Sequence, residues 1–162
     1  MSSPEHKQKI WNLIKEIGVG MLVTQDEGTP RARPMHLVQD AYDGTLWFYT
    51  QKSAEKAFEA QSDRDVCITF SDQEEGVYVS MSGRARLRQD SEIIDKYWNS
   101  FIAAWFDGGR EDPDIAIMEI DIRFGEHWKS KESKAYQLYE IAKSNVKKEH
   151  TPDMGENEKF GH

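Results

Sequence analysis

The chain has 162 residues, 38% hydrophobic and 31% charged, a composition typical of one soluble domain with a sizeable core. Its 21 basic and 29 acidic residues give a formal net charge of −8, which disfavours general binding to nucleic acid or to anionic membranes. The single cysteine, Cys67, excludes an intramolecular disulfide and a cysteine-rich metal site, and we expect it to be a small structural residue in a strand.

The expected organisation is one domain over residues 1–146, closed by a C-terminal helix, and a polar tail over residues 147–162 that we expect to be flexible. No segment reaches the roughly 18 consecutive apolar residues of a transmembrane helix. The N-terminal sequence MSSPEHKQK lacks the apolar core of a signal peptide. We therefore expect a cytoplasmic protein without a membrane partner.

The first predicted element is a helix that begins near Pro4 and ends at Gly18. Its apolar positions recur at helical spacing and predict a buried stripe: Ile10, Leu13, Ile14 and Ile17. A short strand follows over residues 21–24, and then a turn into the stretch 29–56.

The stretch 29–56 reads as strand, tight turn, strand and helix start. In the first strand, Arg31, Arg33 and Met35 alternate onto one face. Turn residues at 40–44 allow the chain to reverse, and the aromatic run at 46–50 predicts a second, neighbouring strand.

The helix start after this second strand has an unusual charge. Ser53 is a plausible N-cap, and Lys56 then falls in the first helical turn, where a cation opposes the helix dipole. A bound anion would explain this lysine, because Thr50 and Ser53 supply hydroxyls beside the backbone N–H groups. The alternative is an exposed helix start without a ligand.

The rest of the chain supplies further strands at 66–70, 77–88 and 115–122, with Gly83 predicting a bulge or bend. We expect helices at 91–105 and 133–146, the first with an aromatic face typical of a core or subunit interface. The three arginines Arg84, Arg86 and Arg88 are expected on a solvated strand face beside acidic residues. Together these elements predict a mainly β, α+β fold: a six- to seven-stranded antiparallel barrel with peripheral helices.

Three short motifs occur in order along this chain: Arg31-Ala-Arg33-Pro34-Met35, Trp47-Phe48-Tyr49-Thr50 and Ser53-x-x-Lys56. The ordered set resembles the FMN-binding split-barrel proteins, and most closely the general stress protein branch of the pyridoxamine 5′-phosphate oxidase-like superfamily. The resemblance extends from about Gln8 to Trp128. It implies a split barrel, bound FMN and a homodimer with the cofactor at the subunit interface.

The resemblance also implies which residues bind FMN. Thr50, Ser53 and Lys56 would hold the phosphate, and Arg31 or Arg33 would reach the phosphate or the pyrimidine edge. The ring would lie against the backbone and apolar surface of a further group: Pro34, Met35, Tyr49 and Trp128. For Trp128 the resemblance implies a place near the flavin across the dimer interface, whereas the residue taken alone suits an ordinary core position.

Several positions depart from the pattern of the oxidases themselves. His36 replaces a lysine, Glu55 replaces half of an Arg-Lys pair, and the segment after Trp128 lacks the Arg-x-His that holds a pyridoxine substrate. These changes leave the predicted FMN site intact. They argue against pyridoxamine 5′-phosphate oxidation.

Other chemistries have no motif to support them. The five histidines show no paired spacing of the H-E-x-x-H kind, so we expect no metal site. The sequence also lacks a G-x-S-x-G motif and a P-loop.

Two functional hypotheses remain, and the same residues support both. The chain is either an FMN-dependent oxidoreductase for an unknown small molecule, with NAD(P)H as a candidate electron donor, or an FMN carrier or sensor with little turnover. Neither hypothesis involves nucleic acid.

Overall fold

The computed structural model describes residues 4–26, 28–53, 64–130, 141–143 and 155–161. The helices are α1 (Pro4–Ile17), α3 (Ser91–Tyr97), α4 (Ser100–Ala103) and the short 3₁₀ helix η1 (Gly109–Glu111), and residues 141–143 are also helical. The strands are β1 (Val19–Asp26), β2 (Thr29–His36), β3 (Thr45–Gln51), β4 (Arg64–Asp72), β5 (Val77–Arg88), β6 (Ile115–Lys129) and β7 (Glu156–Gly161). None of the described helices has the length and apolar character that a membrane crossing requires.

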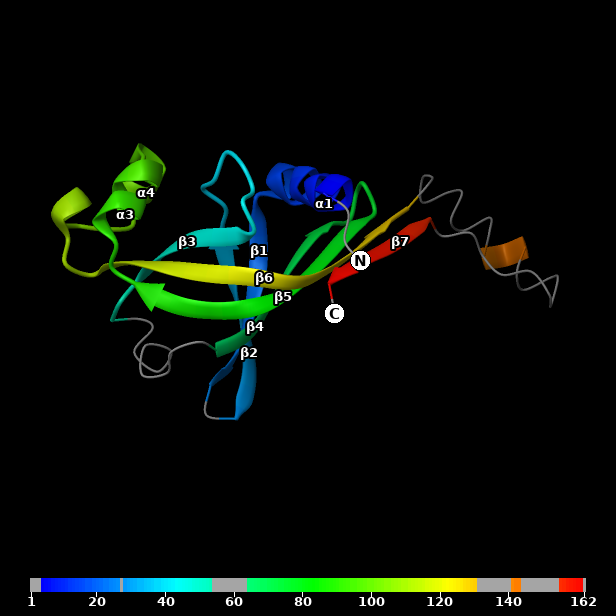
Figure 1. Ribbon diagram of the computed structural model, residues 1–162, viewed down its shortest axis with the longest axis horizontal. Coiled ribbons are helices and arrows are strands. Elements are labelled where there is room, and N and C mark those ends of the chain that lie inside the picture. Colours follow the sequence, from blue (N-terminus) through cyan, green and yellow to red (C-terminus); the bar gives the residue numbers. More distant parts are fainter. Residues whose placement is uncertain (1–3, 27, 54–63, 131–140, 144–154, 162) are drawn as a thin grey trace.

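The strands form one antiparallel, seven-stranded sheet in the order β2-β1-β4-β5-β6-β3, and β7 also pairs with β6. Helices lie at the periphery: α1 covers the sheet near β1, and α3 and α4 lie beyond one end of β6 (Figure 1). The prediction of a mainly β, split-barrel-like α+β fold is confirmed. The sheet is not closed, because β2 and β3 are the two ends of its path.

The predicted pairing of the two strands in the stretch 29–56 is wrong. β2 pairs with β1 and β3 pairs with β6, so the segment 37–44 crosses from one edge of the sheet to the other. On the edge of β3 that does not face β6, the buried side chain of Gln39 takes the place of a second partner strand. Its Nε2 donates to the Thr45 carbonyl at 2.9 Å, and its Oε1 accepts from the Trp47 N–H at 2.9 Å.

The prediction at Gly83 is confirmed by a shift in the β5–β6 register between Ser82 and Gly83. A Cβ at Gly83 would lie 2.0 Å from the Asp121 carbonyl oxygen, so only glycine allows this approach. The strand predicted over residues 115–122 is longer than expected, because β6 continues through Gly125 to Lys129. Gly125 makes room for the ring of Phe160, its register partner on β7.

The helix expected over residues 91–105 is broken into α3 and α4. Trp98 has extended backbone (ψ 134°), and Asn99 caps α4 by accepting a hydrogen bond from the Ile102 N–H at 3.0 Å. This asparagine, rather than the aromatic periodicity, sets the local structure. The break changes which aromatic residues share a face.

The C-terminal region differs from the flexible tail that the sequence suggested. Residues 156–161 form β7, and Phe160 is buried in the main core. The predicted helix at 133–146 lies outside the described residues except for 141–143, which are helical.

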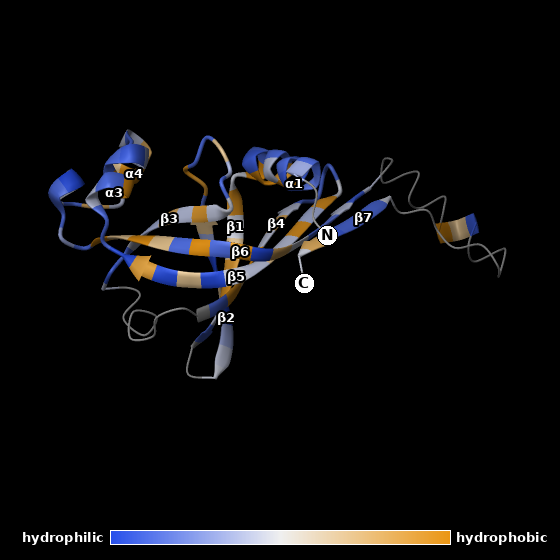
Figure 2. Ribbon diagram, viewed as in Figure 1, coloured by the Kyte–Doolittle hydropathy of each residue, from blue (hydrophilic) through white to orange (hydrophobic). Residues whose placement is uncertain are grey.

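Two apolar clusters hold the molecule together. The larger packs α1, through Ile10, Trp11 and Ile14, onto the inner face of the sheet. The smaller lies under α3 and α4 and contains Trp47, Ile94, Ile102, Phe106, Ile115 and Ile117. Along β5 buried and more exposed residues largely alternate, as expected for a strand with one buried face, whereas β6 begins with four buried apolar residues (Figure 2).

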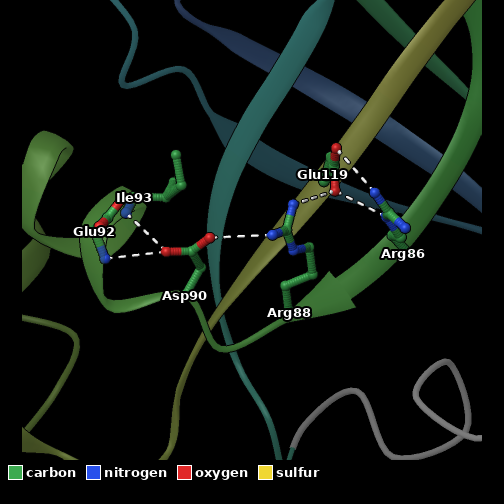
Figure 3. A network of polar contacts seen from close by, with 6 residues as sticks. All are labelled: Arg86, Arg88, Asp90, Glu92, Ile93 and Glu119. Carbon is green, nitrogen blue, oxygen red and sulfur yellow. Dashed lines mark hydrogen bonds and ion pairs between the residues drawn. The ribbon is translucent and has the colours of Figure 1, made fainter.

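The three arginines of β5 lie beside acidic residues, as predicted. Arg86 and Arg88 both donate to the carboxylate of Glu119, and Arg88 also donates to Asp90, which caps α3 (Figure 3). Burial alone would raise the pKa of Glu119, but the hydrogen bonds and charges of the two arginines hold this pKa below its usual value. The network fixes the start of α3 against β5 and β6.

Candidate functional site

A cavity of about 300 Å³ lies at the opening of the sheet between the edge strands β2 and β3, with α4 along its side. The strands contribute Arg33, Pro34, Met35 and His36 from β2 and Tyr49, Thr50 and Gln51 from β3. The remaining walls are apolar: Val38, Phe101, Ile102, Trp105 and Phe106. Five of the nine residues that the sequence predicted as a cofactor site therefore line one cavity: Arg33, Pro34, Met35, Tyr49 and Thr50.

Arg33 is the cationic side chain of this lining. Its alternation with Met35 on β2 turns both side chains inward, and Met35 is buried. The Arg33 guanidinium donates to the Thr24 hydroxyl at 2.8 Å, and Thr24 lies on the neighbouring strand β1 and is only 2% exposed. This contact holds the guanidinium at the cavity wall, where it can meet an anion or a carbonyl edge.

Tyr49 lines the cavity but turns its hydroxyl away into the smaller core. The hydroxyl donates to the Ile94 carbonyl at 2.5 Å, and the ring packs edge-on against Trp98. Burial, with a smaller contribution from nearby Asp95, raises the pKa of Tyr49 to about 12. Tyr49 is therefore uncharged at neutral pH, and its hydroxyl is already bonded to the Ile94 carbonyl.

The structure describes only part of the set of residues that the sequence predicted to bind the phosphate. Thr50 lines the cavity, but Ser53 does not. The Ser53 N–H and hydroxyl both donate to the Asp114 carboxylate at 2.8 Å, so a carboxylate already occupies the place that we had expected for an anion. Lys56 lies outside the described residues.

Two other predicted residues lie away from the cavity. Arg31 is exposed on β2, opposite Thr24 in the β1–β2 register, on the same strand face as Arg33. Trp128 is 40% exposed near the far end of β6, opposite Tyr78. Trp128 lies twelve positions after Ala116, the register partner of Thr50, and twelve positions of extended strand span roughly 40 Å.

Sequence reasoning missed the aromatic rim of the cavity. Phe101 and Trp105 are 54% and 61% exposed, and the ring of Phe101 lies 5.3 Å from that of His36. We had assigned both aromatic residues to a core or subunit interface on one continuous helix. The Asn99 cap was the available signal, because a second N-cap predicts a new helix with a different orientation.

The lining fits a flat ring system with one polar edge. Apolar side chains make up most of the walls, while Arg33, Thr50 and Gln51 place polar groups at the strand edges. Among the described lining residues there is no carboxylate, which would repel an anionic ligand. The volume is at the lower end of the roughly 300–1,000 Å³ of small-molecule sites, so one chain would cover a flavin only in part.

A second hollow, of about 400 Å³, is lined by Thr24, Cys67, Gly83 and Arg123 among others. It is larger but shallower, and none of the predicted cofactor residues lines it. The predicted cofactor residues that line a hollow therefore line the smaller cavity and not this one.

Comparisons with known proteins find relatives along most of the chain. A family model described as pyridoxamine 5′-phosphate oxidase like matches residues 5–153. General stress protein 26 of Bacillus subtilis is 33% identical over 124 residues, which are 75% of this chain and 86% of that protein.

Two crystal structures are similar along most of their length. A candidate general stress protein 26 from Jannaschia sp. CCS1 has a TM-score of 0.74 and 32% identity over 99% of this chain and 100% of the other. The general stress FMN/FAD binding protein of Xanthomonas citri has a TM-score of 0.71 and 30% identity, covering 81% of this chain and 93% of the other.

Proposed function

The chain belongs to the pyridoxamine 5′-phosphate oxidase-like family, in its general stress protein 26 branch, and from this premise we propose that it binds FMN in the cavity between β2 and β3. We propose further that it is a flavin-dependent oxidoreductase that acts on a small molecule. The observation that carries the proposal is the convergence of Arg33, Met35 and Thr50, from two strands that do not pair, on one cavity.

The roles of the residues follow from their chemistry. Arg33 is proposed to bind the pyrimidine edge or the phosphate of FMN, and Thr50 to donate its hydroxyl to the phosphate. Pro34, Met35 and Tyr49 are proposed to form the apolar wall along the ring. Arg31, Ser53 and Lys56 remain proposed ligands, and Ser53 would have to release Asp114 to bind a phosphate.

The redox chemistry would come from the cofactor, since FMN itself accepts and donates hydride equivalents. The protein's part is then to bind the ring, to orient it and to exclude water. Tyr49 is consistent with this role of the protein, because its hydroxyl donates to the Ile94 carbonyl and stays protonated at neutral pH.

A homodimer is part of the proposal. The cavity of one chain is small and open, and its rim carries the exposed rings of Phe101 and Trp105. Trp128 is too distant along β6 to reach the cavity of its own chain, but it is exposed and could reach that of a second copy. Isologous pairing would then place each flavin between two chains.

Reduction of the bound FMN by NADH or NADPH in the absence of oxygen distinguishes an enzyme from a carrier or sensor. The purified protein is expected to bind FMN and show a flavin band near ~450 nm, which NADH or NADPH would bleach rapidly if the chain is an oxidoreductase. A bound flavin that neither nucleotide reduces supports the carrier or sensor. A protein that takes up no FMN contradicts both.

Pyridoxamine 5′-phosphate oxidation is not expected. His36 lies at the cavity rim against Phe101, where the oxidase pattern has a lysine. Incubation of the FMN-loaded protein with pyridoxamine 5′-phosphate and oxygen should form no pyridoxal 5′-phosphate.

A further inference from the structure

A cluster of two histidines and two glutamates lies at the end of the molecule opposite α3 and α4. His6 comes from the first turn of α1, His127 from β6, and Glu156 and Glu158 from β7. The first part of α1 lies beside β7 in this region, as its contacts with Glu156 and Glu158 show (Figure 1). His127 is fully buried, and the side chain of His6 is only 11% exposed.

The distances within the cluster suit one small cation. Nε2 of His6 lies 3.4 Å from Nδ1 of His127 and 3.1 Å from Oε2 of Glu158. The ligand atoms of these three residues all lie within 4.8 Å of one another. A tetrahedral zinc ion with bonds of about 2.0–2.1 Å has ligand–ligand distances of about 3.3–3.4 Å, close to the two shorter separations.

The hydrogen bond of His127 to a carboxylate is a second feature typical of metal sites. Its second ring nitrogen, Nε2, lies 2.8 Å from the Glu156 carboxylate. A proton on Nε2 is donated to this carboxylate, which leaves the lone pair of Nδ1 directed at His6. Metal-binding histidines characteristically donate their other N–H to a carboxylate in this way.

We propose that His6, His127 and Glu158 bind one divalent transition-metal ion of the zinc class, with water in the fourth position. The mixed nitrogen and oxygen donors favour Zn²⁺, Co²⁺ or Ni²⁺ over Mg²⁺ and Ca²⁺, which prefer oxygen ligands. The ion would join α1 to β6 and β7, and so hold the C-terminal strand on the sheet. Sequence spacing could not show this site, because 121 residues separate the two histidines.

Lys9 modulates the proposed site. Its ammonium pairs with Glu156 and lies 3.7 Å from Glu158, so it competes with a cation for the carboxylates. The variant Lys9→Gln is therefore expected to bind the metal several-fold more tightly than the wild type. A purely structural hydrogen-bond cluster would not give this gain.

The test uses the untagged full-length chain, stripped of metal by a chelator and titrated with ZnCl₂ by calorimetry and with Co²⁺ by visible difference spectroscopy. We expect one ion per chain, tetrahedral Co²⁺ bands that Zn²⁺ abolishes, and an unfolding midpoint about 5–10 °C higher at roughly 100 times the Kd. His6→Gln and Glu158→Gln should each weaken binding at least about 10-fold.

His36→Gln is the matched control, since His36 lies at the flavin cavity and outside the cluster. It should leave the metal affinity unchanged. The proposal is overturned if no stoichiometric binding occurs at micromolar Zn²⁺, or if His6→Gln and Glu158→Gln bind as tightly as the wild type. His127 is left intact in this test because replacing a fully buried histidine could unfold the chain.

Discussion

At the scale of single residues, Arg33 is the side chain on which the proposed flavin binding depends most directly. Arg33→Ala is expected to weaken FMN binding by roughly 1.5–3 kcal/mol, about 10- to 150-fold, because it removes a hydrogen bond to a charged or polar edge. Quenching of FMN fluorescence on titration measures the dissociation constant. Arg84→Ala removes an equal charge from outside the cavity, where Arg84 pairs with Asp65, and should leave FMN binding unchanged.

Equal affinities of Arg33→Ala and Arg84→Ala would move the cofactor away from this cavity. Arg33→Lys is a useful intermediate, since it keeps the charge but cannot reproduce the planar guanidinium contact with Thr24. We expect its affinity for FMN to fall between those of the wild type and the alanine variant.

Tyr49 is expected to act on stability rather than on the cofactor. Tyr49→Phe removes the hydrogen bond to the Ile94 carbonyl and should lower the free energy of unfolding by about 0.5–1.5 kcal/mol. The apolar wall remains, so the dissociation constant of FMN should change less than about 2-fold. A large loss of FMN affinity in this variant would instead give the hydroxyl a direct role in binding.

The raised pKa of Tyr49 also predicts how stability changes at high pH. Its pKa is about 12 in the folded chain against an ordinary 10.0, so the folded state holds the proton more tightly. This contribution is complete below pH 10.0 and is lost as the pH rises toward about 12. Denaturant unfolding at about pH 9 and about pH 11 should therefore show a smaller alkaline loss in Tyr49→Phe than in the wild type.

At the scale of elements, strand β7 lies where the sequence predicted a flexible tail. Residues 156–161 are mostly polar and carry no alternating apolar pattern, so local periodicity indicated a flexible tail. Their pairing depends on distant residues: Phe160 packs over Gly125, and Glu156 accepts from His127. Contacts between segments so far apart in the sequence leave no signal in either segment alone.

Phe160 tests the contribution of β7 to stability. Phe160→Ala should lower the free energy of unfolding by about 3–5 kcal/mol, because it empties a buried site above a glycine that cannot fill it. Lys159→Ala changes an exposed neighbour on the same strand and should cost little. Denaturant unfolding of the two variants gives the comparison, and similar stabilities would mean that β7 is not part of the cooperative core.

The two site strands show both the strength and the limit of sequence reasoning. Alternation correctly placed Arg33 and Met35 on one face of β2, and the aromatic run correctly gave β3. The pairing was wrong because turn residues at 40–44 suggest a hairpin, whereas Gln39 satisfies the backbone of β3 without one. Five of the nine residues that the resemblance implied nevertheless line one cavity, since the order of its motifs does not depend on which strands pair.

At the scale of the whole molecule, exposed aromatic residues on an acidic chain point to an interface between copies. Phe101, Trp105 and Trp128 are each at least 40% exposed. Sedimentation at micromolar concentration is expected to give a dimer. A monomer there would contradict the proposal that a second copy completes the flavin site.

A flavin site built from residues of two chains makes a second prediction about the dimer. Trp128→Ala should weaken FMN binding although Trp128 lies outside the cavity of its own chain. When the Arg33→Ala and Trp128→Ala chains are unfolded together and refolded, half of the dimers should be mixed and one of the two sites in each should be intact. About a quarter of all sites would then regain wild-type affinity, whereas a site built from one chain would give no recovery.

The central claim is that the opening between β2 and β3 is a flavin site, and an equilibrium titration of the flavin-free chain with FMN tests it most directly. The proposal predicts saturable quenching of FMN fluorescence with one FMN per chain, and weaker binding of riboflavin, which lacks the phosphate. Absence of saturable binding, or saturable binding that Arg33→Ala leaves unchanged, would contradict it.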